Sequence, residues 1–299
     1  MRFSLLFLRL ILLLSLQFAS GLLYAKNLGV VYPNSSSKAI KYYQVIIDNI
    51  KKNSTHTVII KTLERKTKAN DIKQWIDKNQ IVGLVTLSKY SKKIVNKLDL
   101  SIPVIHASSN FIKPSKHYQV NLIVSPRVFN KFIPSLTPNV KKIHVVVHRN
   151  LKWAFDHINH PSLSYQFHEI NNAKEMIISY KTILKSMNKN ETILMGYEGF
   201  KVHRKMIKNL LLKAWKKKVP LYTQNVVYVK KGMLLGVFND FNQYGQQIAK
   251  LLNKIFSGVK VKKTHLSNNY HLAFNRRTAK YLDANIDNDA YTIVFPNKK

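Results

Sequence analysis

The sequence predicts an α/β fold of two doubly wound, parallel-sheet lobes joined by a multi-strand hinge. Short apolar runs alternate with segments of helical apolar spacing, and this alternation occurs twice along the chain. Each copy ends on a basic helix followed by an apolar-Pro-apolar strand, at Pro103 and at Pro220. A proline at the first residue of a strand forfeits no ladder hydrogen bond. Alternating strands and helices favour parallel sheets covered on both faces, so two copies predict two lobes.

The first copy begins with an apolar run at 28–32. Pro33-Asn34-Ser35-Ser36 then forms a turn, and apolar residues at helical spacing follow over 38–52. The same reasoning gives the later elements of this copy, which are strands at 58–60, 81–87 and 102–106 and helices at 69–79 and 89–98.

The second copy repeats the pattern with strands at 143–148, 164–168, 192–195 and 219–222 and helices at 173–187 and 201–217. Outside the repeat lie a strand-like segment at 118–124, a strand at 233–238, a helix at 243–256 and a strand at 271–275. The chain is therefore expected to cross between the lobes more than once. We assign 26–124 plus 237–264 to lobe 1 and 125–236 plus 265–299 to lobe 2. Several crossings restrict the lobes to opening and closing about one axis, which suits a ligand clamp.

Residues 1–25 are predicted to be a secretory signal peptide. The first nine residues carry Arg2 and Arg9 and no acid, and residues 10–18 form an apolar run. Small residues follow at 19–21 and at Ala25. The uninterrupted run falls short of the roughly 20 residues that a membrane span needs. Cleavage is expected after Ala25, with the 19–21 segment as the alternative site. The mature chain is expected in the periplasm, and it is not a lipoprotein because it contains no cysteine.

Composition excludes several classes of protein. A hydrophobic content of 45% excludes disorder by composition, and the lack of cysteine excludes disulfide scaffolds and thiolate zinc sites. The 49 Lys+Arg against 14 Asp+Glu give a formal net charge of +35, with no acid over 100–155 or 199–239. This charge is interpreted mainly as compositional drift, with weak association with anionic membrane surfaces at low salt. Nucleic acid is not expected as a partner of an exported chain.

Five segments carry a family resemblance. They are 229–237 (Val-Lys-Lys-Gly-Met-Leu-Leu-Gly-Val), 244–250 (Tyr-Gly-Gln-Gln-Ile-Ala-Lys), 254–258 (Lys-Ile-Phe-Ser-Gly), 272–280 (Leu-Ala-Phe-Asn-Arg-Arg-Thr-Ala-Lys) and 136–143 (Leu-Thr-Pro-Asn-Val-Lys-Lys-Ile). With these, the chain resembles the substrate-binding proteins of ABC transporters, in the subfamily associated with tryptophan and tyrosine uptake. The resemblance implies a type I periplasmic-binding fold over the mature chain.

Two tips depart from that family pattern. Leu87-Ser88-Lys89 replaces the usual Gly-Thr after the third strand, and Gly196-Tyr197-Glu198-Gly199 stands where members often show Pro and then Asp. Ligands of doubly wound sheets bind beyond the carboxyl ends of the strands, where both tips lie.

Polar residues at those ends are the candidate ligand contacts. The turn before the first helix offers N–H groups and hydroxyls for a carboxylate, although each serine serves equally well as an ordinary N-cap. Arg149 suits a bidentate carboxylate clamp, Glu198 an amine, and Tyr32, Tyr90, Tyr197 and Phe238 an aromatic ring. The full candidate set is Tyr32, Asn34, Ser35, Ser36, Ser88, Ser108, Ser109, Arg149, Tyr197, Glu198, Asn225 and Asn239.

No metal, cofactor or catalytic site is expected. His144 and His148 share one face of a strand, but their spacing with later histidines fits no compact zinc signature. There is no Gly-x-Ser-x-Gly elbow, phosphate-binding loop or Gly-x-Gly-x-x-Gly after a strand.

The expected function is capture of a small solute, an amino acid or a related aromatic carboxylate, by lobe closure and without chemistry. The resemblance implies delivery to the membrane permease of an ABC transporter. Two alternatives keep the fold. One is a sensing module for a membrane receptor, kinase or cyclase, and the other is a basic envelope-associated protein that binds no ligand.

Overall fold

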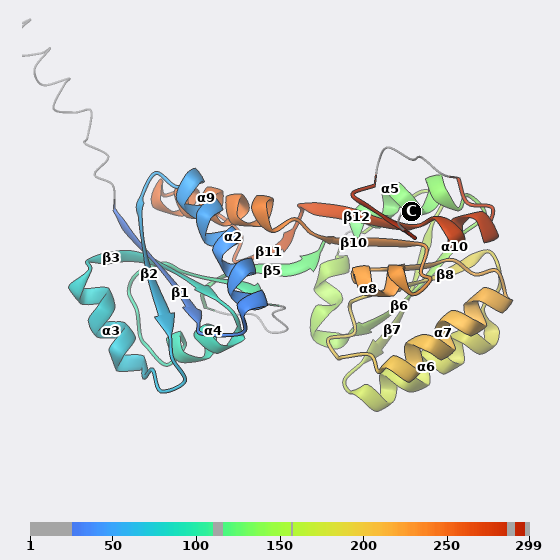
Figure 1. Ribbon diagram of the computed structural model, residues 1–299, viewed down its shortest axis with the longest axis horizontal. Coiled ribbons are helices and arrows are strands. Elements are labelled where there is room, and N and C mark those ends of the chain that lie inside the picture. The colour runs from blue at the N-terminus through green and yellow to red at the C-terminus, as the bar shows by residue number, and fades with distance from the viewer. Residues whose placement is uncertain (1–25, 110–115, 157, 286–290, 297–299) are drawn as a thin grey trace, which may run out of the picture.

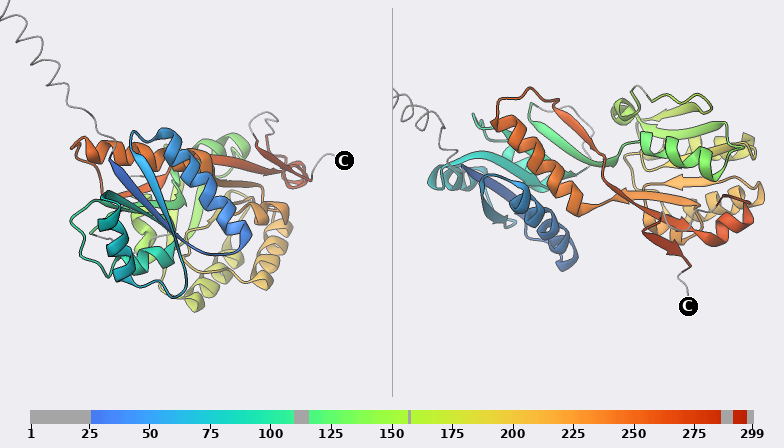
Figure 2. Two further views of the ribbon diagram at one scale, coloured as in Figure 1. Left: turned by 60° about the vertical axis from the view of Figure 1, so that its left-hand side comes forward. Right: turned by 90° about the horizontal axis from the view of Figure 1, so that it is seen from above.

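The computed structural model describes residues 26–109, 116–156, 158–285 and 291–296. These residues form two lobes that lie side by side and are joined by strands that run between them (Figure 1). Viewed from above, the joining segments lie close together between the lobes (Figure 2, right). The expected signal peptide lies outside the described residues.

Lobe 1 is built on a six-stranded sheet in the order β11-β5-β4-β3-β1-β2, in which all neighbours are parallel. Its strands are β1 (Asn27–Pro33), β2 (Thr57–Leu63), β3 (Ile81–Leu87), β4 (Val104–Ser109), β5 (Tyr118–Val124) and β11 (Thr264–Ser267). Its helices are α2 (Ser37–Asn53), α3 (Ala69–Lys78), α4 (Lys89–Val95) and α9 (Phe241–Phe256).

Helices cover both faces of this sheet. Val30 packs in a core with residues of α2 and α9, whereas its neighbour Val31 packs with residues of α3 and α4. Successive side chains of a strand point to opposite faces, so a strand covered on both faces is apolar throughout. This explains why the strands were visible as continuous apolar runs.

Lobe 2 holds a seven-stranded sheet in the order β13-β12-β10-β9-β8-β6-β7. Its strands are β6 (Lys142–His148), β7 (Ser164–Ile170), β8 (Glu191–Met195), β9 (Leu221–Thr223), β10 (Leu235–Asn239), β12 (Tyr270–Asn275) and β13 (Ile293–Phe295). Its helices are α5 (Arg127–Leu136), the 3₁₀ helix η1 (Arg149–Phe155), α6 (Ala173–Ser186), α7 (Arg204–Lys216), α8 (Val226–Lys230) and α10 (Arg276–Tyr281). Val146 packs with residues of α6 and α7, and Val145 and Val147 pack on the opposite face, so this sheet is covered on both faces too.

The chain crosses between the lobes after β5, after β10 and between β11 and β12. β10 runs toward the crossing and β12 returns from it, so these two strands pair antiparallel within an otherwise parallel sheet. The second sheet is therefore parallel, as expected, at every neighbouring pair except this one.

Two expected lobe boundaries also shift. β10 remains in the second sheet as far as Asn239, and β11 remains in the first as far as Ser267. The returning segment of lobe 1 therefore covers 240–267 rather than 237–264. Polar or turn-forming residues lie at each crossing, at 125–126, 239–240 and 268–269, but similar residues occur in many other loops, so the sequence does not fix where the chain changes sheets.

The two prolines that mark the repeat occupy equivalent places. Pro103 directly precedes β4, and Pro220 directly precedes β9. Both proline carbonyl oxygens accept hydrogen bonds from the neighbouring strand. The Pro103 carbonyl accepts from the Leu84 N–H at 2.9 Å, and the Pro220 carbonyl accepts from the Thr192 hydroxyl at 2.7 Å. Among the described residues, no helix is both long enough and apolar enough to span a membrane.

A close helix contact in lobe 1 gives a first prediction. A Cβ added at Gly245 of α9 would lie 2.5 Å from the backbone oxygen of Ile46 in α2 and 2.7 Å from the Asn49 Cβ. We expect Gly245→Val to lower the free energy of unfolding by about 1–3 kcal/mol, because the two helices must separate to admit the side chain. Urea denaturation measures this. Lys250→Ala, at an exposed position of α9, should change stability by less than about 0.5 kcal/mol, and equal effects of the two variants would contradict the packing.

Candidate functional site

A cavity of about 650 Å³ lies at the carboxyl ends of the strands, with walls from both lobes. Lobe 1 contributes Lys89 at the start of α4, Leu122 of β5 and Phe241 at the start of α9. We call β5 the hinge strand, because the chain first crosses to lobe 2 after it. Lobe 2 contributes residues at or after the carboxyl ends of β8, β9 and β10, which are Gly196, Glu198, Gly199, Phe200, Lys201, Val202, Thr223, Gln224, Asn225, Tyr228, Phe238 and Asn239. Its size falls within the range of small-ligand sites.

The lining is aromatic and positively charged. Four of the lining side chains are the rings of Phe200, Tyr228, Phe238 and Phe241. Two exposed lysines, Lys89 from lobe 1 and Lys201 from lobe 2, face this cavity from opposite sides of the cleft. Glu198 is the acid among the described lining residues, so the electrostatics of the cavity depend on the state of that carboxyl group.

The Glu198 carboxyl group is held by its own lobe. The residue is 4% exposed, its Oε1 accepts from the Tyr180 hydroxyl, and the Gly196 N–H lies 3.1 Å from each carboxylate oxygen. Burial raises the pKa of Glu198, and the donors from Tyr180 and Gly196 offset part of that rise. Glu198 is therefore a buried, internally bonded acid rather than a free negative charge in the cleft.

Side chains of lobe 2 fix the hinge strand at the floor of the cleft. The Val124 N–H donates to Gln224 Oε1 at 2.8 Å, and its carbonyl accepts from the Tyr197 hydroxyl at 3.0 Å. The Asn239 amide nitrogen donates to the Leu122 carbonyl. Asn239 Oδ1 is buried and, within the described residues, has no hydrogen-bond partner. A buried unpaired acceptor is costly, so this oxygen suits a donor from a ligand or water.

The lobe 1 candidates are not among the residues that line the cavity. Tyr32 packs on Tyr43 with ring centroids 5.6 Å apart, and Asn34 donates to the Glu64 carboxylate at 3.1 Å. Ser35 and Ser36 are exposed at the start of α2, where Ser36 makes no side-chain capping bond.

The later serines are used in the turns. Ser88 is a buried N-cap of α4 that accepts from the Ser91 N–H at 3.2 Å, and its φ is +119°. Ser108, with φ +56°, donates its N–H to the Tyr244 hydroxyl at 2.9 Å. Ser109 is the last residue of β4. The capping role left open for the serines is thus seen at Ser88 and not at Ser36.

The lobe 2 candidates divide into two groups. Glu198, Asn225 and Asn239 line the cavity, and Asn225 also caps α8 by accepting from the Val227 N–H. Tyr197 is fully buried, and its ring lies 4.6 Å from that of Phe155 in the core. The Arg149 side chain is 66% exposed, and its Nε lies 4.0 Å from Glu169 Oε2, so in this structure it points to β7 and does not line the cavity.

Several lining residues were not among the sequence candidates. Lys89 and Lys201 were missed because lysines are abundant throughout the chain, and Phe200 and Tyr228 because aromatic residues are usually core. A usable signal existed for Lys89 and Phe200. Both adjoin the tips at Ser88 and Gly199, where the chain departs from the family pattern.

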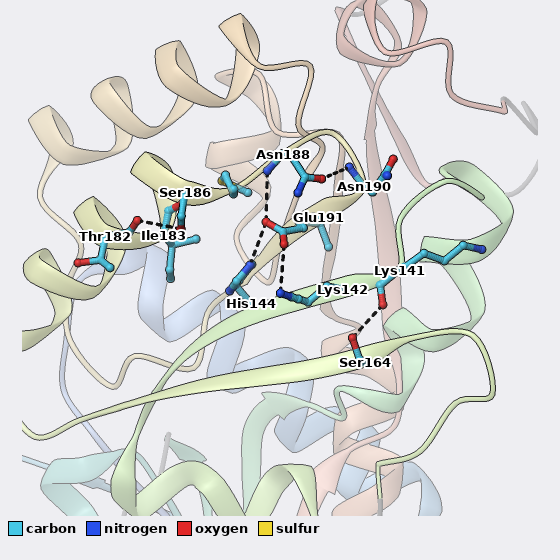
Figure 3. Close-up of polar contacts among 12 residues, drawn as sticks. Lys141, Lys142, His144, Ser164, Thr182, Ile183, Ser186, Asn188, Asn190 and Glu191 are labelled. Atoms are coloured by element: carbon cyan, nitrogen blue, oxygen red, sulfur yellow. Dashed lines mark hydrogen bonds and ion pairs between the residues drawn. The ribbon is translucent and has the colours of Figure 1, made fainter.

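A histidine cluster lies at the other end of lobe 2. His144 Nδ1 lies 3.0 Å from His168 Nε2, and His144 Nε2 lies 3.4 Å from Glu191 Oε2. Figure 3 shows that the Lys142 ammonium group lies 3.2 Å from the same Glu191 carboxylate. This carboxylate also accepts a hydrogen bond from the Asn188 N–H. These contacts align the first residues of β6 and β8, away from the cavity. Among the described residues, no group of three or more His, Asp or Glu side chains is placed to hold a metal.

The buried carboxyl group generates a pH prediction. A raised folded-state pKa makes the stabilising contribution of Glu198 full below its ordinary value of 4.5 and progressively lost as the pH rises through the raised value. Glu198→Gln removes this titration while keeping an acceptor for Gly196. We expect the stability of Glu198→Gln to fall less than that of the wild-type protein as the pH rises above 4.5 toward neutrality, as measured by urea midpoints. Parallel pH profiles for the two proteins would refute this.

No family model matches the sequence, and no curated protein matches it. Solved structures do match. A substrate-binding protein with adhesive properties from Clostridium difficile, in its ligand-free, open form, has a TM-score of 0.60 at 12% identity, covering 91% of this chain and 100% of that one. An ABC domain in complex with L-Trp from Streptococcus pneumonia has a TM-score of 0.52 at 15% identity, covering 90% and 99%.

A conserved domain protein from Vibrio cholerae O1 biovar El Tor matches similarly, with a TM-score of 0.51 at 15% identity over 90% and 99% of the two chains. At these identities the likeness concerns the fold. It confirms the two-lobed expectation: the chain has the type I periplasmic-binding fold, with two α/β lobes on either side of a cleft.

Proposed function

We propose that the protein is a periplasmic solute-binding protein that captures a small aromatic carboxylate between its lobes for an ABC transporter. The observation that carries this proposal is the interlobe cavity of about 650 Å³, which combines four aromatic rings with lysines from both lobes. A ligand that touches both walls stabilises the closed arrangement of the lobes, because it gains contacts there that the open form lacks.

The lysines support an anionic ligand. Lys89 and Lys201 come from different lobes, and neither has an acidic partner among the described residues. An anion between them therefore gains charge-assisted hydrogen bonds on both sides. Arg149, the residue expected from the sequence to clamp a carboxylate, instead lies beside Glu169. We therefore assign the binding of the ligand carboxylate to Lys89 and Lys201 instead.

The state of Glu198 narrows the ligand class further. The sequence suggested that this residue receives the amine of an amino acid, but its carboxyl group already bonds Tyr180 and Gly196 and is buried. Releasing it would leave the buried Tyr180 hydroxyl unpaired, at a cost of about 1–3 kcal/mol. The cavity therefore favours a carboxylate without an α-amine over the corresponding amino acid.

The walls favour a planar, apolar ligand body. Phe200, Tyr228 and Phe238 of lobe 2 and Phe241 of lobe 1 all line the cavity, and aromatic pairs add about 0.5–1.5 kcal/mol beyond burial. The Streptococcus complex holds L-Trp, so a ligand with an aromatic ring is compatible with this fold. The transporter and the periplasmic location rest on the sequence resemblance and on the predicted signal peptide.

A matched set of three ligands tests the proposal. Indole-3-propionate carries the carboxylate alone, L-tryptophan carries carboxylate and amine, and tryptamine carries the amine alone. We expect the melting temperature to rise most with indole-3-propionate, less with tryptophan and not with tryptamine. Saturation at about 100 times the dissociation constant adds ~2.7 kcal/mol, which corresponds to at least about 5 °C. The reverse order would show that Glu198 does receive an amine, and no shift with any acid would refute the ligand class.

The two lysines give a matched mutational test. Lys89→Gln and Lys201→Gln should each weaken binding of indole-3-propionate by about tenfold, because each removes one charge-assisted bond. Lys93→Gln removes the same charge from an exposed position of α4 that does not line the cavity, and it should leave affinity within about twofold. Isothermal titration calorimetry measures all three. Equal losses in the three variants would indicate only a general effect of net charge.

A further inference from the structure

Exposed aliphatic and aromatic side chains are concentrated on one side of lobe 2. Seven large hydrophobic residues are exposed in the described part of the chain, and four of them lie on α6 and α7. They are Ile177, Ile178, Leu212 and Trp215; Ile178 is 54% exposed and Leu212 is 52% exposed. Single exposed hydrophobic residues are normal, but a cluster on two adjacent helices marks an interaction surface.

The two helices form one continuous outer layer. α6 and α7 lie side by side along the lower edge of lobe 2 in Figure 1, and the Lys217 ammonium group after α7 donates to the carbonyls of Lys185 and Met187 at the end of α6, both at 3.0 Å. Their buried sides pack on the sheet through a common core. The opposite sides of both helices therefore face outward together.

Lysines accompany the exposed apolar residues at helical spacing. On α6, Lys174, Ile178, Lys181 and Lys185 form one exposed stripe, and on α7, Lys205, Lys208, Leu212 and Trp215 form another. α7 contains no acid, and the acid of α6, Glu175, bonds the backbone and side chains of Asn171 and Asn172 at the start of the helix. This surface is amphipathic and strongly basic.

A groove of about 380 Å³ runs between the helices. Its floor is apolar, with Ile177, Leu184 and Met206, and its rim carries Lys181, Lys205 and Lys213. The lysines offer ammonium groups to phosphates, and the apolar side chains offer hydrocarbon contact.

We infer that the α6–α7 surface is a docking surface for an anionic phospholipid bilayer. Headgroup phosphates meet the lysines, and Ile178, Leu212 and the groove floor enter the boundary between headgroups and acyl chains. Nucleic acid would use the lysines but would leave the exposed aliphatic residues in water. The apolar residues thus favour a lipid surface over other polyanions.

Docking through this surface leaves the ligand cavity free. No described residue lines both the groove and the interlobe cavity. The inference therefore does not depend on the ligand proposed above, and either can fail alone.

Cosedimentation of the purified protein with vesicles tests the inference. Vesicles with about 30 mol% phosphatidylglycerol in phosphatidylcholine should bind the protein, and pure phosphatidylcholine should bind it at least tenfold more weakly. The variant K181Q/K205Q/K213Q should weaken binding by about 100-fold, because each lysine near an anionic surface contributes roughly fivefold. I178S/L212S should weaken it by about tenfold without any change in charge.

Matched controls lie in lobe 1. K51Q/K73Q/K78Q removes the same charge from exposed positions of α2 and α3, and Y42S/V259S removes exposed hydrophobic residues elsewhere. Both should retain binding within about threefold, and melting temperatures show whether each variant is folded. Equal losses in the two lysine triples would overturn the inference in favour of diffuse charge attraction. Unchanged binding of I178S/L212S would overturn the insertion of apolar side chains.

Discussion

The geometry of the cleft depends on how the chain leaves the first sheet at Val124. A strand that crosses between lobes leaves backbone groups without ladder partners, and such groups must be bonded when they are buried. Here the Val124 N–H donates to Gln224, and the Val124 carbonyl accepts from the Tyr197 hydroxyl. Ser267 of β11 pairs with Val124 in the first sheet. The floor of the cavity is therefore a fixed joint, and the walls on either side carry the other lining side chains.

Much of the fold was predictable because it follows from local patterns. Apolar runs gave the strands that are buried on both faces, and Pro103 and Pro220 marked the repeat. The short helices α8 and α10 and the edge strands β11 and β13 were missed, because few residues carry their pattern. The antiparallel pair of β10 and β12 was missed because it depends on the direction of a chain returning from the other lobe.

The site was less predictable than the fold, since a sequence shows which residues follow a strand but not where their side chains point. Tyr197 and Glu198 stand at the expected tip, but Gly196 and Gly199 adopt φ values of +119° and +70° and turn the intervening side chains inward. As a result Tyr197 joins the core and Glu198 bonds Tyr180. Lys201, three residues after Glu198, carries the charge that faces the cavity.

The burial of Glu198 also determines the net charge of the cavity lining. With Glu198 buried and bonded, the lysines of the cavity have no opposing free carboxylate among the described lining residues, and the charge of the lining is positive. Tyr180 links this arrangement to the α6–α7 surface, because the same side chain forms part of the groove and donates its hydroxyl to Glu198. The packing of α6 against the sheet therefore helps to hold the Glu198 carboxyl group within lobe 2. The outer helices shape both an outward basic surface and the electrostatics of the cavity within.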